Sequence, residues 1–135
     1  MQNVEDFDIA KNFVAIKDED YNKFYIFDLR TQEKVAEPIA LNVTFSSDGQ
    51  SFIANISGYN YSYFEWNDNF KYFKMKTPLI KNAALRIEFA PESNKKLVIF
   101  DEYYNSLLIR DMEKDEITII FNNCTFDSTE YFVIT

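Results

Sequence analysis

Related segments recur at intervals of roughly 40 residues along this chain. Each segment starts at a phenylalanine and reaches an acidic or amide residue 21 or 22 positions later. The three pairs and the start of a fourth segment are Phe7 with Asp28, Phe45 with Asn67, Phe89 with Asp111, and Phe126. A repeat of this length indicates one supersecondary unit copied in series, because a single unit cannot bury its apolar face alone. The repeat therefore excludes most architectures, while it says little about chemistry.

Short apolar runs alternate with turn-forming residues inside each segment. In the second segment the runs 52–56, 61–66 and 70–75 are separated by the polar stretches 57–60 and 67–69. Turns at intervals of about 8–12 residues, between β-branched and aromatic runs, are typical of an all-β protein.

One strand of each segment is continuously apolar. The runs 13–16, 52–54 and 97–100 contain only apolar residues, so we expect both faces of these strands to be covered. The strand that follows alternates, as in 23–27, and the fourth strand includes charged residues. This order favours radially stacked sheets, in which inner strands lie between neighbouring sheets and outer strands face water.

Three segments end their third strand with a dipeptide that carries a carboxyl or amide: Phe27-Asp28, Trp66-Asn67 and Arg110-Asp111. Related turns and strands lie at 24–35, 45–52, 89–93 and 126–132. These residues resemble the WD-repeat β-propeller family, whose third strand ends with an aromatic-Asp pair. The Gly-His pair of that family is missing, because the chain has no histidine. The resemblance extends over nearly the whole chain.

The resemblance implies an all-β fold: a partial β-propeller of about three and a half four-stranded antiparallel blades, in one region spanning 1–135. The expected blades are 4–41, 42–81 and 82–121, with a half blade at 122–135. Closed propellers use about four to eight blades, so the chain is expected to be part of a longer protein or to be completed by another chain. The completing chain is a second copy, giving about seven blades in a homodimer, or another propeller segment. We therefore expect that the isolated chain is not a compact monomer.

The composition argues against catalysis and against nucleic-acid or membrane partners. The net charge is −8 and the longest run of basic residues is Lys95-Lys96, so nucleic-acid backbones and anionic lipids should be repelled. The absence of histidine removes the common catalytic triads and imidazole metal sites, and the two glycines cannot form a phosphate loop. We therefore expect no catalytic residues, no metal and no cofactor. A glycosidase-type carboxylate pair stays open as a hydrolase alternative, because such a pair has no local signature.

The chain also carries the signs of a cytoplasmic protein. The residues at its N-terminus are acidic and lack the basic start and apolar stretch of a secretory signal. No apolar run approaches the roughly 18 residues of a membrane helix. Cys124 is the single cysteine and cannot form an internal disulfide, so a reducing compartment is the expectation.

The turn between the second and third strands is the candidate binding surface. In the propellers that this chain resembles, these turns share one face with the connections between blades, and that face commonly binds partners. The candidate partner-binding residues are Asp18, Glu19, Asp20, Tyr21, Tyr59, Tyr61, Asp101, Glu102, Tyr103 and Tyr104. Tyrosine supplies rigid contact area with a polar tip, and carboxylates attract basic segments. The alternative is that the Tyr-Asn pairs only form the turns and the acidic residues only keep the surface soluble.

Two functions follow from these observations. The first is a non-catalytic protein–protein interaction or scaffold module, built from propeller repeats and binding a protein partner, for which the negative net charge favours a basic one. The alternative is a small acidic inhibitor or immunity-type protein that binds a basic enzyme, which the charge of −8 and the short length favour.

Overall fold

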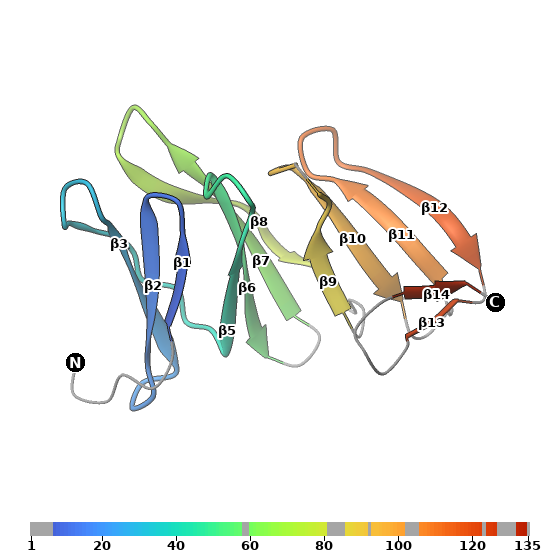
Figure 1. The fold of residues 1–135 in the computed structure, drawn as a ribbon, viewed down its shortest axis with the longest axis horizontal. Helices are drawn as coiled ribbons and strands as arrows, with labels where there is room; N and C mark the ends of the chain where they lie inside the picture. The colour runs from blue at the N-terminus through green and yellow to red at the C-terminus, as the bar shows by residue number, and fades with distance from the viewer. Residues whose placement is uncertain are drawn as a thin grey trace.

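The computed structural model of the chain describes residues 7–57, 60–80, 86–91, 93–101, 106–122, 124–126 and 132–134. Within these residues the strands form three four-stranded sheets and one two-stranded hairpin (Figure 1). The first sheet consists of β1 (Phe7–Ala10), β2 (Phe13–Asp18), β3 (Lys23–Asp28) and β4 (Lys34–Ala36). The second sheet consists of β5 (Asn42–Phe45), β6 (Ser51–Ser57), β7 (Asn60–Asn67) and β8 (Tyr72–Ile80). The third sheet consists of β9 (Arg86–Phe89), β10 (Lys96–Asp101), β11 (Ser106–Asp111) and β12 (Glu116–Asn122), and the hairpin of β13 (Cys124–Phe126) and β14 (Phe132–Ile134).

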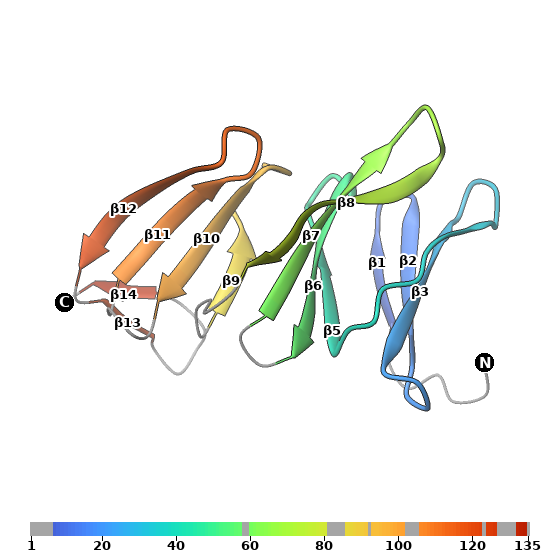
Figure 2. The same cartoon turned by 180° about the vertical axis from the view of Figure 1, so that it is seen from behind.

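Each sheet is an antiparallel meander in which consecutive strands are neighbours. The three sheets stand side by side like the leaves of a fan, in the order of the chain (Figures 1 and 2). Between the first two sheets β1 contacts β5 and β4 contacts β8, so equivalent strands face one another. The all-β prediction and the predicted stacking of sheets are therefore confirmed.

The acidic or amide residue of each repeat caps the turn between the third and fourth strands. Its side-chain oxygen accepts a hydrogen bond from the backbone N–H two residues later. The three bonds are Asp28 with Arg30 at 2.9 Å, Asn67 with Asn69 at 3.0 Å, and Asp111 with Glu113 at 3.0 Å. Four residues after each cap the backbone has a positive φ, at Gln32, Lys71 and Asp115. The sequence repeat thus marks one turn geometry, which needs a carboxyl or amide oxygen at its first position.

The first core lies between the first and second sheets and is largely aromatic. The ring of Phe13 lies 4.9 Å from Trp66 and 4.8 Å from Phe73, measured between centroids. The guanidinium of Arg30, which is bonded to the cap Asp28, lies 5.5 Å from the ring of Phe13 and 5.8 Å from that of Trp66. The buried side chains of this core are Phe13, Ala15, Phe24, Ile26, Val35, Ala40, Val43, Phe45, Phe52, Ala54 and Phe73. The turn cap Asp28 therefore also holds the Arg30 guanidinium over aromatic rings of the first and second sheets, where the two sheets pack together.

The second core lies between the second and third sheets and contains a polar hub. Its buried side chains are Ile53, Tyr61, Tyr63, Ile87, Leu97 and Ile99. The hydroxyl of Tyr63 lies 2.7 Å from the carbonyl oxygen of Asn94, 3.0 Å from Glu65 Oε2 and 3.1 Å from Ser51 Oγ. Burial raises the pKa of Tyr63, so its proton stays in place as a donor. Because Asn94 belongs to the β9–β10 turn, the hub links the second sheet to the third.

The continuously apolar strands are not all covered in the same way. On β6, Phe52 lies in the first core and Ile53 in the second, so both faces of this strand are covered. On β2, Phe13 lies in the first core, whereas Val14 is only half-buried on the opposite face. The expectation of two covered faces is therefore confirmed for β6 and wrong for β2, because among the described residues no sheet precedes the first one.

Candidate partner-binding surface

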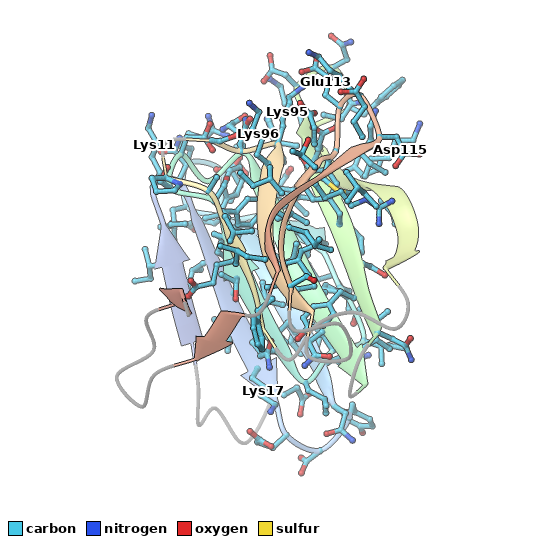
Figure 3. All side chains as sticks on the ribbon, turned by 90° about the vertical axis from the view of Figure 1, so that its right-hand side faces the viewer. Lys11, Lys17, Lys95, Lys96, Glu113 and Asp115 are labelled. Carbon is cyan, nitrogen blue, oxygen red and sulfur yellow. The ribbon has the colours of Figure 1, made fainter. Side chains whose placement is uncertain are left out.

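The two ends of the sheets form two distinct faces of the molecule. One end carries the β2–β3 turn (residues 19–22) and the connection 37–41 between the first two sheets, and it lies at the bottom of Figure 1. We call this end the lower face. The opposite end carries the β1–β2 and β3–β4 turns and is called the upper face. Figure 3 shows Lys17 at the lower face and Lys95 and Glu113 at the upper face. The predicted site residues in the β2–β3 turn belong to the lower face.

Asp18 holds the β2–β3 turn together from inside. Its Oδ1 accepts a hydrogen bond from the backbone N–H of Asp20 at 3.1 Å, and its Oδ2 accepts one from the hydroxyl of Tyr25 at 3.1 Å. The residue is buried, and the turn is completed by a positive φ at Asn22. For Asp18 the structure thus supports the turn-forming alternative, since a buried, bonded carboxylate is not available to a partner.

Tyr21 projects from the same turn and is 68% exposed. The ammonium of Lys23 lies 5.4 Å from the centre of its ring and 3.0 Å from Glu37 Oε1. The hydrogen bond between these two side chains raises the pKa of Lys23 and lowers the pKa of Glu37. Glu19 pairs with Lys17 at 3.5 Å. The predicted carboxylate Glu19 and the carboxylate of Glu37, which was not predicted, therefore each lie beside a lysine.

The connection between the first two sheets adds apolar side chains to the lower face. It follows the edge of the β2–β3 turn, where the backbone N–H of Ala40 donates to the carbonyl of Asn22 at 3.1 Å and Lys23 forms a bridge with Ile39. Ile39 is 67% exposed, and Leu41 is exposed as well. Neither residue was predicted from the sequence. The available signal was a pair of large aliphatic residues after Pro38, in a segment that is too short to be a core strand.

An apolar groove opens beside this connection, between the first and second sheets. Its volume is about 500 Å³. Its walls come from the connection and from β4, β6, β7 and β8, and include Ile39, Ile56, Phe64 and Met75. On the side of the first sheet, β4 has only three residues and the connection 37–41 forms most of the wall, whereas β8 in the second sheet has nine residues.

The remaining predicted residues do not join this surface. Tyr61 is buried in the second core, which corrects its assignment to the binding surface, because alternation along β7 directs its ring toward the third sheet. Tyr59, Glu102, Tyr103, Tyr104 and the side chain of Asp101 lie outside the described residues. The predicted residues that the structure places on the exposed lower face are thus Glu19, Asp20 and Tyr21.

The described residues include no group of three or more acidic, cysteine or histidine side chains placed to hold a metal ion. No helix in the described part of the chain is long and apolar enough to cross a membrane.

Comparisons with known proteins agree with this architecture. No protein-family model and no curated protein matches the sequence. Among solved structures, the chain is similar to the β-propeller domain of Cps50 (Swd1) from Myceliophteria thermophila, with a TM-score of 0.54 and 9% identity over 86% of this chain and 41% of that one. It is also similar to the N-terminal domain of Nup159, with a TM-score of 0.52 and 14% identity over 89% of this chain and 30% of that one. The chain thus spans less than half the length of either structure.

The stacked four-stranded meanders and these similarities define a β-propeller fold. The chain is a divergent partial β-propeller, and the predicted fold class and the resemblance to propeller repeats are both confirmed at the level of the fold.

Proposed function

We propose that this chain is a non-catalytic protein-interaction module whose lower face binds a segment of another protein. The observation that carries the proposal is the continuity of exposed apolar side chains there. Tyr21, Ile39 and Leu41 project into solvent on adjoining backbone segments, and Ile39 also forms a wall of the apolar groove. Exposed apolar surface next to a groove marks an interaction site more often than a scattered apolar residue does.

The chemistry of the surface favours a partner segment with an apolar anchor and basic flanks. The groove offers an apolar lining for the anchor, and Tyr21 offers rigid contact area with a polar tip. The net charge of −8 attracts basic segments at long range, although Lys17 and Lys23 neutralise part of the local carboxylate charge. Charge therefore contributes mainly to the rate and selectivity of binding, and the apolar anchor to its affinity.

A pair of synthetic peptides tests this proposal. Both carry the same central Leu-Phe-Leu anchor, flanked by lysines in one and by glutamates in the other. Fluorescence anisotropy should show that the lysine-flanked peptide binds at least about tenfold more tightly, and that added salt reduces the difference.

Two matched variants locate the site. Ile39→Asp should weaken the lysine-flanked peptide by about tenfold or more, which is about 1.4 kcal/mol, because a carboxylate replaces apolar contact. Phe70→Asp is the control, since Phe70 is 72% exposed in the β7–β8 turn on the upper face. Equal binding of the two peptides would contradict the preference for basic flanks, and equal loss in both variants would show that the lower face is not the site.

A further inference from the structure

One face of the first sheet is apolar and carries no described element. It is the face turned away from the second sheet, and we call it the open face (Figures 1 and 2). Its described apolar side chains are Ile9, Val14, Ile16, Tyr25 and Phe27. Ile9 is 58% exposed, and the other four are half-buried.

The register of the sheet joins these side chains into a continuous surface. Ile9 pairs with Val14, and Val14 pairs with Phe27, so the three lie in one row across β1, β2 and β3. Ile16 pairs with Tyr25 in the next row. Opposed residues of neighbouring antiparallel strands stand on the same face, so the two rows form one apolar patch.

The equivalent face of the second sheet packs against the first sheet, so it shows how such side chains are buried when another sheet precedes theirs. Phe64 and Trp66 stand three residues and one residue before the turn cap of their sheet, as Tyr25 and Phe27 do in theirs. Trp66 packs on Phe13 of the first sheet at 4.9 Å. In the third sheet the residue three before the cap, Leu108, packs against the second core. The open face therefore carries, at the same positions, the kind of side chains that elsewhere in this chain contact a preceding sheet.

Charged side chains surround the open face without blocking it. Lys23 and Lys34 lie 5.5 and 5.6 Å from the centre of the Tyr25 ring, at the margin of the face, and both pair with Glu37. The closed seam between the second and third sheets has a similar margin, where Lys95 pairs with Glu65 and Glu113. Lysines at the margin are thus compatible with a packed seam.

We infer that a second copy of this chain covers the open face, with a sheet from its C-terminal side packed where a preceding blade would lie. A twisted sheet fits this face, because its apolar side chains stand at the positions that contact a preceding sheet elsewhere in the chain. The chain itself contains sheets of this kind, at the other end of the fan. In the part of the chain that the structure describes, three sheets and a hairpin are fewer than the four to eight blades of a closed propeller, and the described sheets of two copies lie within that range. A contact of this head-to-tail type closes into a ring when a two-fold axis runs along the propeller axis.

The mass of the assembly in solution tests this inference. Multi-angle light scattering and native mass spectrometry of the purified chain should show two copies of the 16.0 kDa chain. Ile9→Lys should raise the dissociation constant of the dimer at least tenfold, because the lysine charge is buried in the seam. Val14→Lys is the second variant and should act in the same direction. Circular dichroism should show that both variants remain folded, since Ile9 is exposed and Val14 half-exposed in the single chain.

Ile117→Lys is a matched control. Ile117 is 59% exposed on β12, nearly the same as Ile9, and its pairing with Arg110 places it on the side that faces the second sheet. This variant should dimerise like the wild type, and so should Ile39→Asp on the lower face, which separates this inference from the proposed partner site. A wild-type chain that stays at one copy at high concentration overturns the inference. A dimer that resists both Ile9→Lys and Val14→Lys, or that Ile117→Lys disrupts equally, overturns it as well.

Discussion

The hydroxyl of Tyr63 joins the second and third sheets, and its removal is the most direct test of how this fold is held together. Tyr63→Phe keeps the buried ring and deletes the oxygen that lies 2.7 Å from the carbonyl of Asn94, 3.0 Å from Glu65 Oε2 and 3.1 Å from Ser51 Oγ. The ring is fully buried, so water cannot easily replace the lost partner. The variant therefore changes hydrogen bonding with almost no change in packing.

The expected loss of unfolding free energy follows from the number of hydrogen bonds that the Tyr63 hydroxyl can form with its single proton. A tyrosine hydroxyl donates one hydrogen bond, here to Asn94 as the nearest acceptor, and accepts one from Ser51. Each bond contributes about 1 kcal/mol net, and a buried hydroxyl left without a partner adds about 1 kcal/mol more. Glu65 keeps Lys76 and Lys95, each at 3.6 Å, and adds little. The free energy of unfolding should thus fall by about 2–3 kcal/mol, which lowers the melting temperature of a domain of this size by roughly 10 °C.

Tyr61→Phe is the control for this measurement. Tyr61 lies on the same strand and the same face, is also buried, and has a pKa that burial alone raises. Its change in unfolding free energy should stay within about 1 kcal/mol. Urea denaturation gives both free energies, and hydrogen exchange should show faster opening of the β9–β10 turn in Tyr63→Phe only. If the two variants lose the same stability, the link between the sheets does not depend on this hydroxyl.

Two further predictions concern turns. Gly49, in the β5–β6 turn, has a φ of +73°, and an added Cβ there would lie 3.0 Å from the carbonyl oxygen of Ala10 at the end of β1. Gly49→Ala should therefore lower the free energy of unfolding by about 1–2 kcal/mol in urea denaturation. An unchanged free energy would mean that neither the left-handed backbone nor the contact with Ala10 opposes a side chain at this position. The hydrogen bond from Arg30 lowers the pKa of Asp28, so this carboxylate stabilises the fold above its unfolded-state pKa of about 3.9 and loses that contribution as the pH falls through the folded-state pKa. Asp28→Asn should therefore lower stability at neutral pH and flatten the loss of stability below about pH 4; a variant with the wild-type acid profile would contradict this assignment.

The turn caps were predictable because their chemistry is local. A carboxyl or amide at Asp28, Asn67 and Asp111 captures the N–H two residues on, whatever surrounds the turn, so the requirement recurs in the sequence as a repeat. The apolar strands were predictable for the same reason, since alternation and runs of apolar residues report which strands are buried.

The candidate site was predicted only in part, because exposure depends on neighbours that are distant in sequence. Asp18 and Tyr21 belong to one acidic turn, yet the first is buried against Tyr25 and the second projects into solvent. Ile39 looked like an ordinary connection residue until its segment was placed beside the β2–β3 turn.

The amino-acid sequence by itself determined that copied β-units stack through apolar faces, because hydrogen-bonded turns and side-chain alternation act over a few residues. Only the tertiary structure decided which faces the described residues leave uncovered. The groove beside Ile39 lies between the first sheet, whose β4 has three residues, and the second sheet, whose β8 has nine. The open face at Ile9 and Val14 is the side of the first sheet on which no described element lies. Both depend on where whole sheets lie relative to one another, and no pattern within a single strand records that.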